Sequence, residues 1–208
     1  MIEQLPFNLT LLDKHRDVLE AKKPWSGAQW NDVNFKENIK PTIRQQLDNN
    51  QKVCAYCGLP FKGNKDKQIE HIAAKANYRY PQFTFILQNL VLSCGYCNSL
   101  IVKGAKNTLG DPISINYEDC VFLLVHPYFD NPSDHFDWIE DDENDQVLIQ
   151  IKDNSQKAKF SIEMFDLASQ GMSELRSCSS FRKKRQIEMP LPPDQENLLK
   201  QALDYIPE

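Results

Sequence analysis

No part of the 208-residue sequence approaches the about 18 consecutive apolar residues that a membrane-spanning helix requires. An export signal is missing too, because charged residues from Asp13 to Arg16 interrupt the apolar N-terminal run. Internal repeats and long low-complexity tracts are also absent. These absences argue against a membrane protein, an exported protein and a repeat array, and we expect a cytoplasmic location.

What is present is the composition of a soluble globular protein, with 41% hydrophobic and 25% charged residues. A chain of this length buries enough apolar surface to form a core, so the six cysteines need not substitute for one. In a reducing compartment, spaced cysteine pairs predict metal ligands before they predict disulfides.

The net charge of −5 and the pI near 5.4 argue at first against nucleic acid as a partner. The distribution of charge changes this interpretation. Between Asn50 and Gly110 there are eight basic and two acidic residues, so this segment carries +6 and the rest of the chain −11. A basic surface there suits a polyanionic substrate, and solvated charge without a ligand is an equally good interpretation.

Apolar periodicity and turn residues predict a mixed α+β protein. We expect helices at 8–21, 41–50, 157–167, 173–186 and, after a proline-rich linker, in the tail at 189–206. We expect strands at 68–72, 83–93, 117–129 and 146–152, a turn at 140–145, and a short helix from residue 98, broken near Gly104. The predicted organisation is an N-terminal helical region (1–50), a core (51–115) and a C-terminal strand and helix extension (116–208).

The strongest motif is a pair of Cys-x-x-Cys sequences, CAYC at 54–57 and CGYC at 94–97, separated by 36 residues. Each pair forms a turn that directs two thiolates to one metal. Two pairs make the closed tetrahedral S₄ set that structural Zn²⁺ prefers. The ligands would be Cys54, Cys57, Cys94 and Cys97, with buried or redox-active cysteines as the alternative.

Between and just after the cysteine pairs stand an acidic-His-Ile sequence, an Asn-Leu sequence and a Cys-Asn sequence followed by Lys-Gly. The residues are Glu70-His71-Ile72, Asn89-Leu90, Cys97-Asn98 and Lys103-Gly104. With the four cysteines, this pattern resembles the HNH endonucleases, in their four-cysteine zinc-containing branch. The resemblance implies a ββα-metal core in which two strands and a helix surround a divalent ion and the zinc anchors both ends.

The resemblance also implies a role for each residue. His71 would be the general base that activates water, for which an ordinary histidine pKa is suited. Glu70 and Asn98 would bind a catalytic Mg²⁺ or Mn²⁺ through oxygen atoms. Asn89 would fix the connecting loop by hydrogen bonds. The substrate would be DNA, with RNA as an alternative.

Other interpretations of the same residues remain open. His71 and Asn89 are then structural, Asn98 is a helix cap, and the module is a non-catalytic zinc ribbon that binds nucleic acid or protein. The sequence also departs from the family pattern, because four residues separate Asn98 from Lys103, where the family often has two.

A second, looser resemblance covers the C-terminal part. The residues are Lys157-Ala158, Ser161-Ile162, Leu167, Leu175-Arg176 and the basic run Arg182 to Arg185. Together with the core, they resemble the HNH nuclease subunit of Septu-type anti-phage defence systems. That resemblance implies a defence role and a partner ATPase.

His126 and His135 flank an aspartate-rich segment that is either a second metal site or, as we favour, a packed turn. Arg182–Arg185 either contacts phosphate or a partner, or lies on a solvated helix face. Cys120 is predicted to lie in the core, and Cys178 has no evident partner in the sequence.

Overall fold

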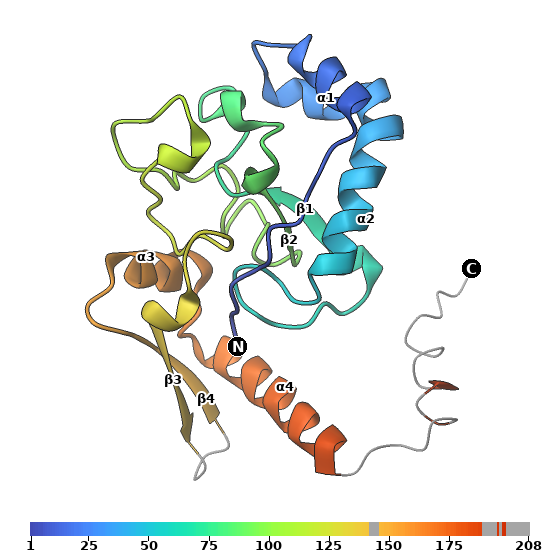
Figure 1. Cartoon of the computed structure of the whole chain (residues 1–208). Helices are drawn as coiled ribbons and strands as arrows, with labels where there is room; N and C mark the ends of the chain where they lie inside the picture. Colours follow the sequence, from blue (N-terminus) through green and yellow to red (C-terminus); the bar gives the residue numbers. More distant parts are fainter. Residues whose placement is uncertain (142–145, 189–194, 196, 199–208) are drawn as a thin grey trace.

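The computed structural model describes residues 1–141, 146–188, 195, 197 and 198, and Figure 1 shows their arrangement. Helices and strands both occur, so the predicted α+β class is confirmed. The helices are α1 (Asp13–Glu20), α2 (Lys40–Asn50), α3 (Gln156–Phe165) and α4 (Gln170–Glu188). The strands are β1 (Gln68–His71), β2 (Leu90–Ser93), β3 (Phe136–Asp141) and β4 (Gln146–Ile151), joined by several single helical turns.

The N-terminal helices α1 and α2 lie side by side at one end of the molecule (Figure 1). Pro41 stands in the first turn of α2, where its missing N–H leaves no hydrogen bond unmade. Two short turns connect the helices, a 3₁₀ turn (Gly27–Asn31) and a π turn (Phe35–Ile39). The buried side chains of this region form the first of two hydrophobic clusters.

The central element is an antiparallel hairpin of β1 and β2, in which Glu70 pairs with Val91 and His71 with Leu90. Successive side chains of a strand point to opposite faces. One face therefore carries His71 and Leu90, and Leu90 belongs to the N-terminal cluster. The other face carries Glu70 and Val91, and Val91 belongs to the second cluster, which includes the cysteines and the C-terminal elements.

The C-terminal elements β3, β4 and α4 form a hairpin with a helix packed on it. Ser177 Oγ of α4 accepts a hydrogen bond from the Val147 amide, and Ser173 Oγ and Arg176 Nε donate to the Val147 carbonyl. Ser155 caps α3, because its side-chain oxygen accepts from the Ala158 amide. None of the described helices is long and apolar enough to cross a membrane.

Several local predictions were wrong. The strand expected at 117–129 is a 3₁₀ turn followed by irregular chain, with a single bridge from Leu109 to Phe122. Phe122, Leu124 and Val125 of its apolar run are buried, but the Val125 backbone amide bonds to a side chain, Ser161 Oγ, instead of to a neighbouring strand. A short apolar run is compatible with burial in either form.

The helix expected from residue 98 is a series of turns, so the ββα pattern lacks a regular helix here. Gly104 adopts a positive φ of 47°, which a right-handed helix does not contain, so the chain turns away within two residues of the buried Val102. The turn expected at 140–145 is partly wrong, because Glu140 and Asp141 are the last residues of β3. Residues 142–145 lie outside the described residues, so the rest of this prediction stays untested. The predicted tail helix at 189–206 also falls largely outside them.

Candidate functional site

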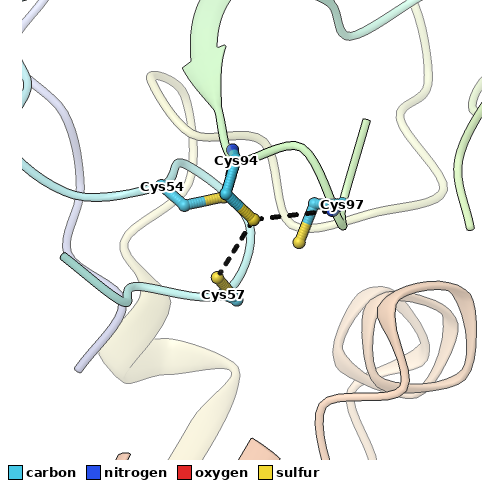
Figure 2. A group of neighbouring side chains, drawn as sticks. All are labelled: Cys54, Cys57, Cys94 and Cys97. Carbon is cyan, nitrogen blue, oxygen red and sulfur yellow. Dashed lines mark hydrogen bonds between the residues drawn. The ribbon is translucent and has the colours of Figure 1, made fainter. Parts of the chain in front are cut away.

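The four cysteines of the two Cys-x-x-Cys motifs converge on one point (Figure 2). Their Sγ atoms all lie within 4.8 Å of one another, and none forms a disulfide. A tetrahedral ion with metal–sulfur bonds of about 2.3 Å separates its sulfurs by about 3.8 Å, so the cluster fits such an ion. Backbone amides support the sulfurs, with Cys94 N–H donating to Cys54 Sγ (3.3 Å) and Cys97 N–H to Cys94 Sγ (3.5 Å).

Beside this cluster, Glu70 forms a buried ion pair with Lys103. The Lys103 ammonium has no solvent exposure and donates to Glu70 Oε1 and to the His71 carbonyl (2.7 Å). Burial raises the pKa of the Glu70 carboxyl, and the charge of Lys103 opposes that rise. Lys103 therefore fixes one carboxylate oxygen, and a hydrogen bond from the His71 backbone also supports the charged carboxylate.

His71 lies on the opposite face of β1 and is 5% exposed. Its ring stands edge-on to the Trp30 ring, with 4.4 Å between centroids, and Nε2–H donates to the Thr84 carbonyl (3.1 Å). That bond assigns the ring proton to Nε2 and leaves Nδ1 as the basic nitrogen. No described residue hydrogen-bonds to Nδ1. Burial lowers the pKa of His71 well below its ordinary value, and Lys75 and Lys103 add to the effect, so the ring is neutral at neutral pH.

Asn89 is fully buried and connects three segments of the chain. Its Oδ1 accepts from the Ala73 amide (2.7 Å), and its amide donates to the carbonyls of Ala73 (3.0 Å) and Phe83 (2.9 Å). Tyr117 Oη also donates to Asn89 Oδ1 (3.1 Å). These bonds hold both ends of the loop that follows His71.

Asn98 lies in the turn after the last cysteine, on the same side as Glu70. Its side-chain amide donates to Gln68 Oε1 (2.6 Å), and Gln68 and Glu70, two residues apart on β1, share a face. The Asn98 Oδ1 atom forms no hydrogen bond with the described residues. The structure thus brings Glu70 and Asn98 to one face and places His71 on the other.

Several contacts of this site were missed by the sequence reasoning. The motif includes Lys103 but gives it no role, although a lysine directly after the apolar run Leu100–Val102 suggests a buried stem. The contacts of Trp30, Thr84 and Tyr117 carry no sequence signal, because they join positions far apart in the chain.

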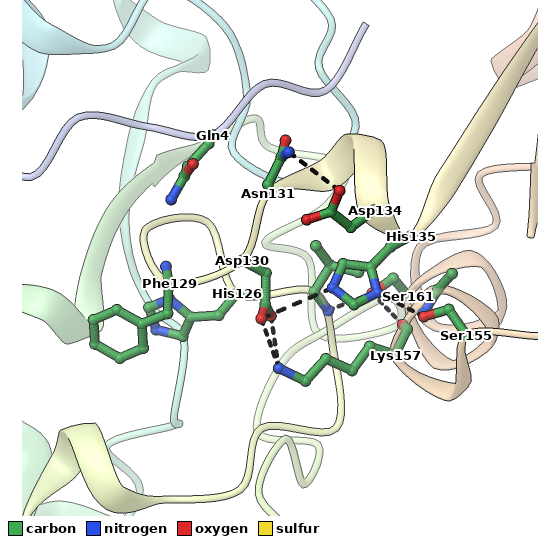
Figure 3. Close-up of polar contacts among 12 residues, drawn as sticks. Gln4, His126, Phe129, Asp130, Asn131, Asp134, His135, Ser155, Lys157 and Ser161 are labelled. Carbon is green, nitrogen blue, oxygen red and sulfur yellow. Dashed lines mark hydrogen bonds and ion pairs between the residues drawn. The ribbon is translucent and has the colours of Figure 1, made fainter. Parts of the chain in front are cut away.

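The histidines of the C-terminal part have structural surroundings, shown in Figure 3. His126 Nδ1 accepts from the amides of Tyr128 and Phe129. His135 Nδ1 contacts Ser155 Oγ (2.7 Å), and Asp130 binds Lys157 through both of its oxygens. Within the described residues, only the four cysteines bring three or more such ligands together. The side chains of Arg182–Arg185 lie outside the described ones.

The fold and the site define a class: a small α+β domain with a hairpin, a cysteine metal cluster and a histidine at the end of the first strand. Comparison with protein families agrees, because residues 54–102 match the family described as HNH endonuclease. Domains of this family are generally nucleases that use metal ions and act on nucleic acid. A search of curated proteins finds no significant match to the chain.

The Septu-type resemblance gains no support from these comparisons. The family match ends at Val102, before the residues 157–185 on which that resemblance depended. The division into regions 1–50, 51–115 and 116–208 stays a prediction.

Proposed function

We propose that the chain is a divalent-metal-dependent endonuclease that hydrolyses phosphodiester bonds in DNA, with His71 as its general base. The observation that carries the proposal is the setting of His71 at the end of β1. Its Nε2–H is held by the Thr84 carbonyl, and Nδ1 has no partner among the described residues. A general base must be neutral and must offer a lone pair, and Nδ1 meets both conditions.

Glu70 and Asn98 would hold the catalytic ion. The Glu70 carboxylate and Asn98 Oδ1 lie on one side of β1, and Asn98 Oδ1 has no hydrogen bond within the described residues. Both are hard oxygen donors, so the set fits Mg²⁺ or Mn²⁺. When bound, such an ion stabilises charge on the phosphate and on the leaving oxygen. Lys103 keeps the carboxylate in position, and Asn89 keeps the loop after His71 in register.

The opposite placement of Glu70 and His71 has a use in this reaction. An in-line displacement has its attacking water and its leaving group on opposite sides of phosphorus. A phosphate at the carboxyl end of β1 would have the imidazole on one side and the carboxylate on the other. Zinc in the four-cysteine cluster would be structural, because all four ligand positions are taken by sulfur.

A second candidate function is a non-catalytic zinc module that binds nucleic acid. The low exposure of His71 beneath Trp30 and the ion pair of Glu70 with Lys103 favour it, because both groups are already engaged. A role in anti-phage defence and a partner ATPase have no supporting observation, since the family match covers residues 54–102 alone.

The test is a cleavage assay on supercoiled DNA and on RNA with Mg²⁺ or Mn²⁺, using zinc-loaded wild-type protein and His71→Gln. The glutamine amide can still donate to the Thr84 carbonyl, but it offers no basic nitrogen. We expect the wild type to nick DNA and His71→Gln to lose at least about 100-fold in rate, as removal of a general base does. His135→Gln is the matched control, because half-buried His135 lies in the C-terminal part, outside the proposed site.

Cleavage at the wild-type rate by His71→Gln contradicts the proposed base. Wild-type protein that binds DNA but never cuts it, with binding unchanged in His71→Gln and Asn98→Ala, establishes the binding module instead. Cleavage of RNA alone corrects the substrate class.

A further inference from the structure

Three lysines gather near Trp30, the residue whose ring lies against His71. Two of them, Lys36 and Lys40, follow each other one helical turn apart at the start of the α2 region. The third, Lys75, lies in the loop after β1. Lys36 and Lys40 stand outside the family match at 54–102, so the resemblance to known nucleases assigns them nothing.

Trp30 connects Lys40 to the proposed base. The Lys40 ammonium lies over the Trp30 ring, 5.3 Å from its centroid, and the same ring lies 4.4 Å from the ring of His71. The positive charges of Lys75 and Lys40 both contribute to lowering the pKa of His71, as expected for ammonium groups close to its ring. Lys36 and Lys75 in turn lower the pKa of Lys40, after burial as the main cause.

Lys75 packs against Gly27, which belongs to the same 3₁₀ turn as Trp30. A Cβ on Gly27 would lie 2.2 Å from the Lys75 carbonyl oxygen and 3.6 Å from Lys75 Cγ, so only glycine permits this approach. The Gly27 amide also donates to Asn77 Oδ1 (3.3 Å). The turn that carries Trp30 is thereby fixed against the loop that carries Lys75.

None of the three ammonium groups forms an ion pair within the part of the chain that the structure describes, and the carboxylate on which Lys75 acts, that of Glu70, is already paired with Lys103. The ion pairs among the described residues involve other basic side chains, including Arg44, which binds Asp48 and the Lys67 carbonyl. Lys36 is exposed, and Lys40 and Lys75 are half-buried. Like charges that gather without a counter-charge raise the free energy of the folded state, unless a bound anion compensates them.

We propose that Lys36, Lys40 and Lys75 form a binding site for a backbone phosphate of the nucleic acid, beside the cleaved bond on the His71 side. The site deepens the proposed function and rests on it. Its ligand is a phosphodiester, the one anion that a nuclease substrate presents at every nucleotide. The N-terminal region thus supplies part of the substrate-binding surface of the nuclease.

The experiment measures DNA binding by the full-length, zinc-loaded protein in the His71→Gln background, which prevents cleavage. A short fluorescent duplex of random sequence is titrated at a series of salt concentrations. Lys36→Gln, Lys40→Gln and Lys75→Gln are each expected to weaken binding about three- to ten-fold and to reduce the slope of log K against log salt by about 0.9. Lys40→Arg and Lys75→Arg should keep the wild-type slope.

Lys159→Gln is the matched control, because this exposed lysine lies on α3, in another part of the molecule. Gly27→Ala tests the positioning, and it should weaken binding as Lys75→Gln does while the lysines remain. Thermal melting of each variant shows that the fold is retained.

If the three test variants bind DNA with the same affinity and the same salt slope as the control Lys159→Gln, the phosphate site is overturned. Cleavage by the wild type would then still support the proposed function. If the wild type neither binds nor cuts any nucleic acid, the proposed function fails first. Loss of binding to acidic phospholipid vesicles, with DNA binding unchanged, would also overturn the site.

Discussion

The Tyr117 hydroxyl donates a hydrogen bond to Asn89 Oδ1 across 3.1 Å and joins the C-terminal part to the loop between β1 and β2. The connection continues beyond it. His126 Nδ1 accepts two backbone amides, so the ring proton is on Nε2, which donates to the Tyr117 hydroxyl (3.1 Å). The buried side chains of His126, Tyr117 and Asn89 are therefore linked by consecutive hydrogen bonds, and the last of these bonds joins Asn89 to the Ala73 amide.

Tyr117→Phe removes the middle of this series and leaves the Nε2–H of His126 buried without an acceptor. We expect the free energy of unfolding to fall by about 1–3 kcal/mol, measured by urea denaturation. Tyr78→Phe is the control, because Tyr78 is 75% exposed, and its stability should stay unchanged. Equal stability of the two variants would show that the hydrogen bonds of Tyr117 contribute nothing.

The Glu70–Lys103 ion pair predicts a strongly non-additive pair of substitutions. Lys103→Met leaves a buried carboxylate without its partner and should cost about 3–5 kcal/mol of unfolding free energy. Glu70→Gln combined with Lys103→Met removes both charges, and most of that loss should be recovered. Nuclease activity should remain absent in the double variant, because the proposed ion ligand is gone. Additive losses of stability would contradict the pairing.

Removal of the metal cluster should unfold the centre of the protein. We expect zinc bound stoichiometrically in the purified protein, by elemental analysis, and its loss in Cys97→Ala. Cys178→Ala is the matched control, since Cys178 is exposed and remote in sequence from the cluster. Zinc retained by Cys97→Ala, or stable near-UV circular dichroism after chelation, would exclude a structural role.

His126 predicts how stability depends on pH. Burial lowers the pKa of His126 to about 3, whereas in the unfolded chain it lies near 6.5. Between these values the unfolded state binds the proton and the folded state does not, so stability rises with pH through this window and is lost as pH falls. The histidine contributes up to about 1.4 kcal/mol per pH unit.

The measurement compares urea denaturation of the wild type and His126→Asn from pH 4 to 7. The asparagine oxygen can replace Nδ1 as acceptor for the amides of Tyr128 and Phe129, but it does not titrate. Carboxylates contribute alike to both proteins, so the difference in slope isolates the histidine. Identical slopes would show that His126 takes up its proton in the folded state.

Local signals predicted the parts of the molecule that local chemistry determines. Pro41 marked the start of α2, and the Cys-x-x-Cys spacing marked the metal cluster, because both depend on a few adjacent residues. β1 and β2 were also predicted, although β2 occupies only the last four residues of the segment expected as a strand, and single helical turns occupy much of the rest.

The sequence reasoning failed where long-range packing decides. The apolar run after Val121 suggested a strand, yet its residues are buried without a neighbouring strand to pair with beyond one bridge. β3 went unpredicted because its aspartates and glutamate obscured the alternation of Phe136 and Trp138. The roles of Glu70, His71, Asn89 and Asn98 remain proposals. Their partners were not predicted, because Thr84 lies in no motif and the pairing of Lys103 with Glu70 joins positions 33 residues apart.

The peptide bond between Glu70 and His71 lies where the two hydrophobic clusters meet, with one side chain directed into each. A destabilising substitution in the N-terminal cluster should therefore displace the His71 imidazole first. A destabilising substitution in the cluster that contains the cysteines should displace the Glu70 carboxylate first. Random mutagenesis should then yield two separable kinds of defective protein. One kind would still hold its ion but fail to activate water, and the other would keep a competent base with no ion opposite it.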